Sequence, residues 1–206
     1  MQPPIVFIPC KLLKESKSRL SRVLTAAARY DLCVRLLDHT IQTAKMITPA
    51  PRVFLITGDE VALGRARHQS ISVIEDLGSL NDALTAARNS ISRIEALDGP
   101  LVVLPIDLVG VSDVALRNSI TALDVTIVPD SMRSGTNLLV LRGDAARSFR
   151  FNFGPNSFSR HYQTAFNANY SISVLDDPVL AFDLDSDRDY WQAGKMGYLD
   201  ALEMAS

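Results

Sequence analysis

The chain has 206 residues, 47% of them hydrophobic, and a formal net charge of −2 at pH 7. A chain of this length and hydrophobic content can bury a sizeable core, so we expect a single α/β domain over residues 1–206. The near-neutral charge, without a long block of Lys or Arg, argues against a nucleic-acid-binding protein.

The N-terminus and the cysteines bear on where the protein works. The opening residues, MQPPIVFIP, have neither the basic region nor the long apolar run of a signal peptide, and no later segment is long enough to span a bilayer. Cys10 and Cys33 form no C-x-x-C pair and have no nearby His partner, which argues against a zinc site or a redox dithiol. We therefore expect a cytoplasmic protein with no membrane partner.

Predicted strands and helices alternate in the first half of the chain. The apolar strand at residues 5–8 leads into a polar, basic stretch and then into a helix for which Thr25 is a suitable N-cap. The alternation continues with strands at residues 52–57, 71–74 and 101–104 and with helices at residues 25–46, 60–68 and 80–94. This order predicts a three-layer domain around a mainly parallel, mixed sheet.

The second half begins with a helix that Ser112 would cap. Two strands at residues 125–128 and 137–141 are joined by a polar turn that contains Gly, which is typical of a hairpin. A tight loop at residues 152–157 then precedes a further helix, and a terminal helix begins near Asp187. No internal repeat or low-complexity linker interrupts this pattern, in keeping with one domain.

Three aspartates follow or continue predicted strands. Asp107 comes directly after the apolar run of residues 101–106, and Asp183 and Asp185 lie two positions apart in residues 181–185, where a strand would place both on one face. Ligands of open α/β sheets collect at the carboxyl ends of strands. Three carboxylates gathered there repel one another, and a hard divalent cation such as Mg²⁺ relieves that repulsion. The pattern therefore indicates a metal site and phosphate chemistry.

The same aspartates also have structural interpretations, as a turn after a strand for Asp107 and as an approach to a helix cap for the other two. An EF-hand is excluded, because Arg188 stands where its invariant Gly is required and Gly194 where its terminal Glu is required. Asp187 and Asp189 are therefore interpreted as first-turn residues favoured by the helix dipole, and not as ligands.

Three basic residues, Lys11, Lys17 and Arg19, lie just beyond the first strand, where their charges could converge on a triphosphate. The surrounding sequence is neither a Walker loop nor a G-x-G-x-x-G motif. On charge alone a solvated basic loop is the simpler interpretation, because exposed Lys and Arg are common. The position after the first strand favours binding.

Two later segments, residues 134–137 and 153–157, offer small side chains, hydroxyls and backbone N–H groups that suit an anionic small molecule. Ordinary turns use the same residue types. His161 follows the second segment by one turn of helix, and we favour a structural role for it over a catalytic one. The chain has no G-x-S-x-G elbow, and no Ser, Cys or His cluster indicates a covalent mechanism.

A set of short motifs runs along nearly the whole chain. The motifs are Pro9-x-Lys11, Lys17-Ser-Arg-Leu20, Leu80-Asn-Asp-Ala-Leu84, Pro105-Ile-Asp-Leu108, Ser134-Gly-Thr-Asn137, Phe153-Gly-Pro-Asn-Ser-Phe158 with His161, and Phe182-Asp-Leu-Asp185. No single motif is specific, but their order and spacing resemble the 2-phospho-L-lactate guanylyltransferase family, with its phosphoenolpyruvate and 3-phospho-D-glycerate guanylyltransferases of coenzyme F-420 biosynthesis. The resemblance implies a nucleotidyltransferase fold, similar to that of nucleotide-diphospho-sugar transferases.

The resemblance also implies an activity and a set of roles. The activity is a Mg²⁺-dependent transfer of GMP from GTP to the phosphate of a small phosphorylated three-carbon acid, with release of pyrophosphate. By position, the nucleotide would be bound by Lys11, Lys17, Arg19 and Asn81, Mg²⁺ by Asp107, Asp183 and Asp185, and the acceptor by Thr136, Gly154 and Ser157. The three aspartates, with Lys17 and Arg19, would carry catalysis. A homodimer is a further implication of the resemblance.

The chain departs from the family pattern at two positions. The family commonly has Asp-Leu-Pro where this chain has Val109 as the third residue, and Gly-Gly-Thr-Asn where this chain begins with Ser134. These departures concern loop geometry and the choice of acceptor more than the metal site. Two other functions stay open, a metal-dependent glycosyltransferase that uses a sugar nucleotide and a non-catalytic nucleotide sensor.

Overall fold

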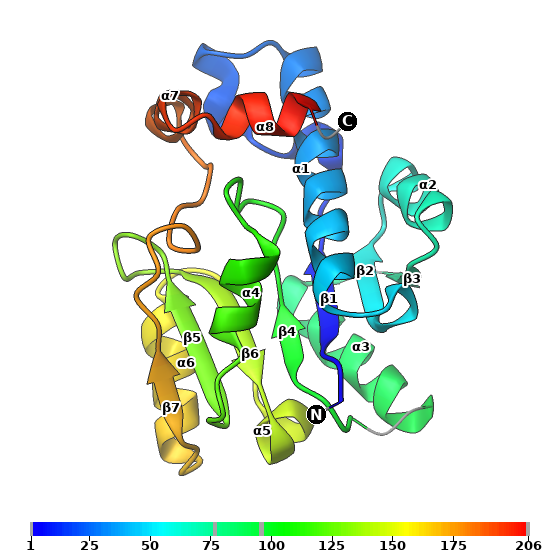
Figure 1. The fold of residues 1–206 in the computed structure, drawn as a ribbon, viewed down its shortest axis with the longest axis vertical. Coiled ribbons are helices and arrows are strands. Elements are labelled where there is room, and N and C mark those ends of the chain that lie inside the picture. The colour runs from blue at the N-terminus through cyan, green and yellow to red at the C-terminus, as the bar shows by residue number, and fades with distance from the viewer. Residues whose placement is uncertain (1, 76–77, 95–96, 205–206) are drawn as a thin grey trace.

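One mixed sheet of seven strands forms the centre of the computed structural model, which describes residues 2–75, 78–94 and 97–204 (Figure 1). The strands are β1 Ile5–Pro9, β2 Val53–Thr57, β3 Ser72–Glu75, β4 Leu101–Val103, β5 Val125–Pro129, β6 Thr136–Leu141 and β7 Ile172–Val174. Their order is β3-β2-β1-β4-β6-β5-β7. Among the described strands only β6 is antiparallel to its neighbours, so the others end at the same edge of the sheet. The prediction of a mainly parallel sheet is confirmed.

Both faces of the central strands are buried, because their side chains alternate between two apolar clusters. In β1, Val6 and Ile8 contribute to one cluster, and Ile5 and Phe7 contribute to the other. A strand that is covered on both faces needs a continuous apolar run, and residues 5–8 show that pattern. The two covered faces thus explain why this strand was recognisable in the sequence.

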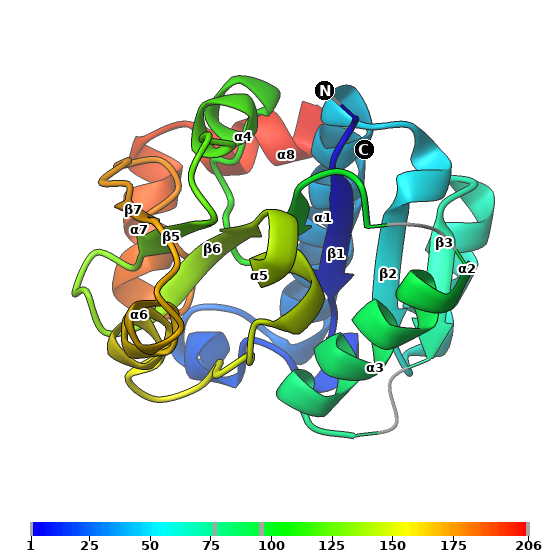
Figure 2. The same cartoon turned by 90° about the horizontal axis from the view of Figure 1, so that it is seen from below.

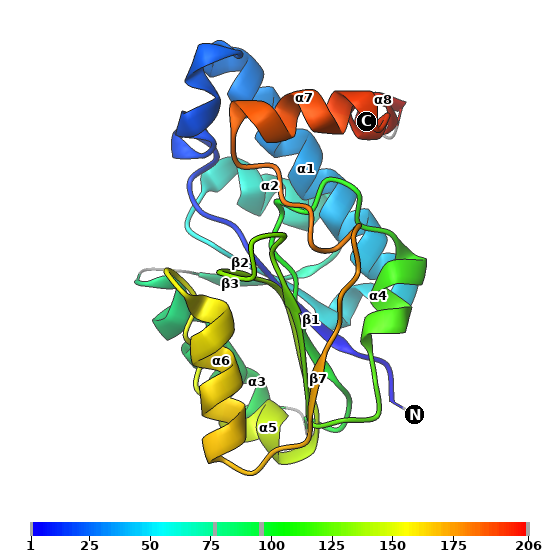
Figure 3. The ribbon, with the colours of Figure 1, turned by 90° about the vertical axis from the view of Figure 1, so that its left-hand side faces the viewer.

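Helices cover both faces and complete the three-layer arrangement (Figure 2, Figure 3). α1, α2 and α4 lie on one face, and α3, α5 and α6 lie on the other. The helices are α1 Ala26–Ile47, α2 Glu60–His68, α3 Leu80–Ile94, α4 Asp113–Ser119, α5 Gly143–Ser148, α6 Ser157–Asn167, α7 Asp187–Lys195 and α8 Tyr198–Met204. The predicted N-caps Thr25 and Ser112 are confirmed, because each side chain accepts a hydrogen bond from the backbone N–H three residues later.

The carboxyl edge of the sheet is covered by the two C-terminal helices (Figure 1). α8 packs against α1, and α7 packs against the 3₁₀ turn η2 Ser18–Arg22, which follows a shorter 3₁₀ turn, η1 Leu13–Glu15. A third apolar cluster at this edge joins Leu20, Val109 and Leu184, which come from the start, the middle and the end of the chain. This packing holds together the segments that carry the predicted cations and the three predicted aspartates.

Some local features differ from the predictions. The strand predicted at residues 181–185 is wrong: this segment lies outside the sheet, although Phe182 and Leu184 are buried and the aspartates between and after them are half-buried. The sequence pattern also gave no sign of β7 or α5, which have three and six residues. Elements this short leave too few positions for a periodic signal. None of the described helices is long and apolar enough to cross a membrane.

Candidate functional site

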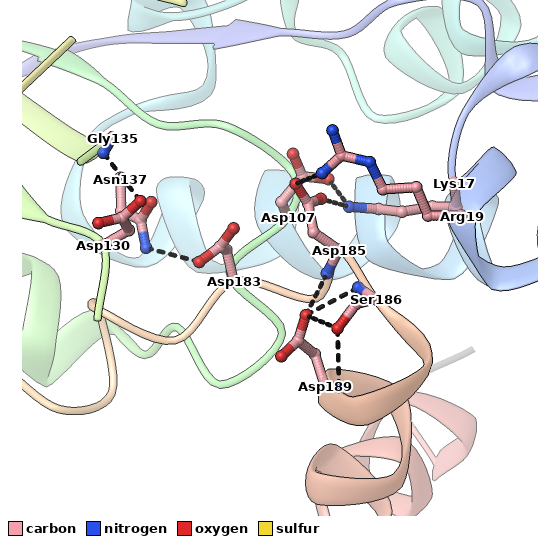
Figure 4. A network of polar contacts seen from close by, with 10 residues as sticks. All are labelled: Lys17, Arg19, Asp107, Asp130, Gly135, Asn137, Asp183, Asp185, Ser186 and Asp189. Atoms are coloured by element: carbon pink, nitrogen blue, oxygen red, sulfur yellow. Dashed lines mark hydrogen bonds and ion pairs between the residues drawn. The ribbon is translucent and has the colours of Figure 1, made fainter. Parts of the chain in front are cut away.

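The carboxyl edge of the sheet brings together residues that are far apart in the chain. β1 and β4 are neighbouring parallel strands, so the segments that follow them, with Lys17 and Asp107, leave the sheet at the same edge. The segment before α7 crosses there too, and Leu184 N–H donates a 3.0 Å hydrogen bond to the Asp107 carbonyl. This backbone contact places Asp183 and Asp185, the neighbours of Leu184, beside Asp107 (Figure 4).

Lys17 lies at the centre of this group. Its Nζ forms ion pairs with Asp107 and with Asp185, the latter at 2.9 Å, and its side chain is only 4% exposed. Burial by itself lowers the pKa of Lys17, but the charges and hydrogen bonds of the two carboxylates outweigh burial and raise the pKa above its usual value. Lys17 is therefore a charged ammonium that is fixed between two carboxylates (Figure 4).

The backbone of Lys17 has a left-handed conformation, with φ 57° and ψ 32°. For a residue with a side chain this conformation costs roughly 1–2 kcal/mol, so surrounding contacts must hold it. One such contact is the 2.9 Å hydrogen bond from Leu20 N–H to the Lys17 carbonyl, and Leu20 is completely buried. The strained turn starts η2 and lets the Lys17 side chain reach the carboxylates.

The other two predicted cations lie on the surface of the same segment. Arg19 is 78% exposed at its side chain, and its Nη1 lies 4.0 Å from Asp185 Oδ2. Lys11 is exposed and forms no ion pair within the described part of the chain. The structure thus brings Lys17 and Arg19 to Asp185 and leaves Lys11 at the start of the segment.

Asp59 anchors this basic segment, a role that the sequence did not predict. Its Oδ2 accepts a 2.9 Å hydrogen bond from Leu13 N–H, and its Oδ1 accepts 3.0 Å hydrogen bonds from Val61 N–H and Ala62 N–H. The residue is 7% exposed and caps α2. The available signal was an Asp directly before a predicted helix, which marks an N-cap but does not reveal the contact with Leu13.

Asp183 faces a different partner from the other two aspartates. Its Oδ1 accepts a 3.3 Å hydrogen bond from Asn137 Nδ2, which also donates to the Leu180 carbonyl at 3.1 Å. Burial and the charges of Asp185 and Asp107 raise the pKa of Asp183, while the Asn137 hydrogen bond works in the opposite direction. Asn137 belongs to one of the motifs given above, but no role was predicted for it. A polar side chain at the start of an otherwise apolar strand was the feature that could have indicated a role in the site.

The fit of these aspartates to a metal ion can be judged from their donor chemistry. No three His, Cys, Asp or Glu side chains among the described residues are grouped so that they could hold a metal ion. Mg²⁺, however, often takes only one or two protein carboxylates together with phosphate oxygens and water. Burial is the largest cause of the raised pKa of Asp183, and the negative charges of Asp185 and Asp107 add to it; a cation would offset those charges. The carboxylate oxygens of Asp107, Asp183 and Asp185 are therefore donors of the kind that Mg²⁺ takes one or two at a time, although in this arrangement the three do not form a closed set of ligands.

The start of α7 fixes the backbone of Asp185. Ser186 caps the helix, and Asp189 Oδ2 accepts hydrogen bonds from Ser186 Oγ, Ser186 N–H and Asp185 N–H, at 2.7, 2.7 and 3.2 Å (Figure 4). The interpretation of Asp187 and Asp189 as first-turn residues is confirmed, because both lie in the first turn of α7. Asp189 thereby holds Asp185 beside Lys17.

A second group of polar residues surrounds the 152–157 loop. Asn81, in α3, donates from Nδ2 to the Phe153 carbonyl at 3.1 Å and accepts at Oδ1 from Phe153 N–H at 2.8 Å. The structure therefore places Asn81 against this loop. Gly154 is exposed and has φ +117°, a conformation that residues with a side chain rarely adopt.

The predicted acceptor residues Thr136 and Ser157 lie beneath the same loop. Thr136 N–H donates to Ser157 Oγ at 2.8 Å, and Thr136 Oγ1 lies 2.9 Å from His161 Nδ1. Thr136 and Ser157 are 7% and 3% exposed, and His161 is completely buried. Since Thr136 precedes Asn137 on β6, this strand joins the second group to Asp183.

The two departures from the family pattern, Val109 and Ser134, both lie in hydrogen-bonded turns. Val109 is buried in the third apolar cluster, and its N–H donates a 3.0 Å hydrogen bond to the Asp107 carbonyl, which a Pro could not do. Ser134 makes its contacts through the backbone: its N–H donates to Asp130 Oδ1 at 2.7 Å, and its carbonyl accepts from Phe158 N–H at 3.2 Å. The loop after Asp107 and the turn before β6 are therefore each held by backbone hydrogen bonds that Val109 and Ser134 make.

Solved structures with similar folds include proteins that are named as nucleotidyltransferases or nucleotide-diphospho-sugar transferases. A nucleotide-diphospho-sugar transferase from Desulfovibrio desulfuricans has a TM-score of 0.68 at 15% identity, over 96% of this chain and 88% of its own. A cytidylyltransferase from Leptospira borgpetersenii has a TM-score of 0.61 at 10% identity, over 99% and 94% of the two chains. At such low identity these matches show the fold alone, and they confirm the predicted nucleotidyltransferase fold.

Sequence relatives identify the family. The phosphoenolpyruvate guanylyltransferase of Chloroflexus aggregans is 35% identical over 187 residues, which cover 87% of this chain and 91% of the relative. The 2-phospho-L-lactate guanylyltransferase of Methanobrevibacter smithii is 27% identical over 187 residues, 88% of this chain and 80% of the relative. A family model described as "Guanylyl transferase CofC like" matches residues 4–193. The chain therefore belongs to the family of CofC-like guanylyl transferases.

Proposed function

We propose that this protein transfers GMP from GTP to the phosphate of a small phosphorylated three-carbon acid and releases pyrophosphate. The observation that carries the proposal is the Lys17 ammonium, which is buried between Asp107 and Asp185 at the carboxyl edge of a nucleotidyltransferase fold. Relatives named as phosphoenolpyruvate and 2-phospho-L-lactate guanylyltransferases support the guanylyl donor and the kind of acceptor.

The reaction is an in-line displacement at the α-phosphorus of GTP. A phosphate oxygen of the acceptor forms the new P–O bond, the bond to the bridging oxygen of the β-phosphate breaks, and pyrophosphate leaves. A phosphate nucleophile is already ionised, so the reaction needs no general base. Alignment of two bound substrates can supply on the order of 7 to 11 kcal/mol towards the barrier, so positioning is the main task of the protein.

Cations of the segment after β1 would bind the GTP phosphates. Lys17 supplies a fixed positive charge beside the carboxylates, while Lys11 and Arg19 are exposed and free to turn towards a ligand. Asn81 would support nucleotide binding from α3. Its amide holds the backbone of Phe153, at the start of the acceptor loop. The negative charge of the GTP phosphates would thus be offset mainly by the segment that follows β1.

Mg²⁺ would be held by Asp107, Asp183 and Asp185, whose oxygen donors suit this ion. When bound, the metal supplies positive charge that stabilises the transferring phosphoryl group and the leaving pyrophosphate. The protein's own part is to hold the carboxylates in place: Asp189 fixes the Asp185 backbone, and Asn137 fixes the Asp183 side chain.

The acceptor would be held by Thr136, Gly154 and Ser157, which lie in or beneath the 152–157 loop at the start of β6. Phosphoenolpyruvate, 2-phospho-L-lactate and 3-phospho-D-glycerate each present a phosphate and a carboxylate on a three-carbon frame, so hydroxyl and backbone donors suit all of them. The guanylylated product would serve as a precursor of coenzyme F-420, in line with the family resemblance.

Pyrophosphate release tests the proposal directly. The purified protein is incubated with GTP, Mg²⁺ and each of the three acceptors in turn, with ATP in place of GTP and an acceptor-free reaction as controls. Release that needs both GTP and one acceptor supports the proposal and names the substrate. Release with none of them contradicts it and favours the glycosyltransferase or the nucleotide sensor, neither of which predicts this reaction.

A further inference from the structure

His161 is a buried residue that the proposed reaction does not use. Its side chain, on α6, is completely buried. Its ring packs edge-on against Phe153, with ring centroids 4.7 Å apart, and tilted against Phe149 at 5.8 Å. Two aromatic neighbours therefore fix the orientation of the imidazole, and with it the directions of both ring nitrogens.

The hydrogen bonds of the ring decide which nitrogen carries the proton. Asn152 N–H lies 2.9 Å from His161 Nε2, and a backbone N–H can only donate, so Nε2 is the acceptor. The proton of the neutral ring is therefore on Nδ1, which lies 2.9 Å from Thr136 Oγ1. Burial, with a smaller effect of the Arg160 charge, lowers the pKa of His161 to about 4, in agreement with a neutral ring at pH 7.

The direction of these bonds determines what two hydroxyl groups can still do. Thr136 Oγ1 accepts from His161 Nδ1–H, and Ser157 Oγ accepts from Thr136 N–H at 2.8 Å. Neither hydroxyl donates to another group within the described residues. Each hydroxyl therefore keeps its own proton for a further partner.

The surroundings allow that partner to come from solution. Ser157 N–H donates to the Gly154 carbonyl at 3.1 Å, so the exposed Gly154 lies one turn before Ser157. Thr136 and Ser157 keep small exposed fractions of 7% and 3%. Two hydroxyl donors next to a glycine loop suit an anionic oxygen, because an anion accepts hydrogen bonds and cannot compete as a donor.

We propose that His161 is a positioning residue: its Nδ1–H orients the Thr136 hydroxyl, so that the Thr136 and Ser157 protons both point to an anionic oxygen of the acceptor acid. This inference rests on the proposed function. His161 itself does not touch the substrate. Its other nitrogen holds Asn152, and thus the start of the 152–157 loop, through a separate hydrogen bond.

Two variants separate these two hydrogen bonds. In His161→Asn, the amide nitrogen takes the place of Nδ1 and can still donate to Thr136, but the contact with Asn152 N–H is lost. In His161→Gln, the amide oxygen takes the place of Nε2 and can still accept from Asn152 N–H, but the donor to Thr136 is lost. If His161 only stabilised the loop, His161→Asn would be the more damaging change for catalysis.

The test measures pyrophosphate release by the full chain with GTP, Mg²⁺ and the acceptor that the wild-type protein uses. We expect His161→Gln to raise the KM for the acceptor about tenfold, because a hydrogen bond to a charged group is weakened, with the KM for GTP unchanged. His161→Asn should keep the acceptor KM within about twofold, because its donor to Thr136 is retained, while its melting temperature falls. Thr136→Val removes the oriented hydroxyl and should raise the acceptor KM by a similar factor.

A double variant gives the decisive comparison. Once Thr136→Val has removed the hydroxyl, adding His161→Gln should have no further effect on the acceptor KM. Multiplication of the two effects in the double variant would overturn the proposal, and so would a larger KM increase in His161→Asn than in His161→Gln. An inactive wild-type protein would instead contradict the proposed function, so the two failures are distinguishable.

The tautomer can be measured without any variant or activity. In ¹⁵N NMR spectra of the wild-type protein at pH 7, the His161 ring should show a protonated Nδ1 and an unprotonated Nε2. A protonated Nε2 would overturn the proposal, because Nδ1 would then accept from the Thr136 hydroxyl and use up its proton.

Discussion

Lys17 Nζ lies 2.9 Å from Asp185 Oδ1, although 168 positions separate the two residues in the chain. The same Nζ pairs with Asp107, so one ammonium joins segments that follow β1 and β4 and precede α7. In a cleft that binds a triphosphate, such a residue would set the positions of two carboxylates and supply charge to the substrate.

Replacement of Lys17 by Met should abolish most of the activity. Loss of a fixed charge next to the transferring group should lower kcat by about a hundredfold or more. Lys14→Met is the matched control, because Lys14 is an exposed residue in η1 of the same segment. Steady-state pyrophosphate release measures both variants, and a Lys17→Met enzyme with near wild-type kcat would remove Lys17 from the catalytic set.

Asp183→Asn should lose metal-dependent turnover and stay folded. The change removes one proposed Mg²⁺ ligand. It also removes a buried negative charge that is repelled by Asp185 and Asp107, so the free energy of unfolding should not fall. Pyrophosphate release over a Mg²⁺ titration and urea denaturation measure the two effects. Asp144→Asn, at a side chain that is 87% exposed in α5, is the control. Full activity of Asp183→Asn at every Mg²⁺ concentration would exclude this carboxylate from the mechanism.

Asp59 should affect both stability and GTP binding, and two substitutions separate the effects. Asp59→Ala removes the cap of α2 and the contact with Leu13, so the free energy of unfolding should fall by about 1–3 kcal/mol. Asp59→Asn can keep the cap through its amide oxygen, but it presents an N–H to the Leu13 N–H. We expect its free energy of unfolding to fall less than that of Asp59→Ala, because the cap of α2 is kept, and its KM for GTP to rise. An unchanged KM in both variants would show that the Leu13 anchor does not matter for the nucleotide.

The turn before β6 should tolerate change at Ser134 and not at Gly135. A Cβ at Gly135 would lie 2.9 Å from Asp130 Oδ2, which accepts the Gly135 N–H at 2.8 Å (Figure 4). Gly135→Ala should therefore shift the turn next to Thr136 and raise the acceptor KM. Ser134→Gly, which restores the family pattern, should leave the KM within about twofold, because the Ser134 contacts are made by its backbone. A large effect of Ser134→Gly would assign a role to its hydroxyl.

His161 should make the protein less stable at acidic pH. Its pKa is about 4 in the folded protein and near 6.5 when unperturbed, so between these values the unfolded chain binds more protons. The stabilisation is fully present above pH 6.5 and is lost as the pH falls towards 4, at a total cost of about 3 kcal/mol. Urea denaturation between pH 7 and pH 4 should show a smaller loss in His161→Gln than in the wild type. His68→Gln, at an exposed histidine, should behave like the wild type.

Much of the architecture could be predicted from the sequence, because its signals are local. A strand buried on both faces needs a continuous apolar run, which residues 5–8 supply, and Thr25 and Ser112 cap helices through neighbouring N–H groups. The elements β7 and α5 were not predicted, because they have too weak a local pattern. They are short, and their stability comes from neighbours in space.

The sequence by itself determined the alternating α/β order, the family and most of the charged residues that are proposed for the site. Only the tertiary structure decided how these residues pair: Lys17 with Asp107 and Asp185, Asp183 with Asn137, and His161 with Thr136. The physical reason is that helix and strand periodicity depends on neighbours a few residues apart, whereas ion pairs and buried hydrogen bonds depend on which strands become adjacent. That adjacency follows from packing the whole sheet, so no local pattern encodes it.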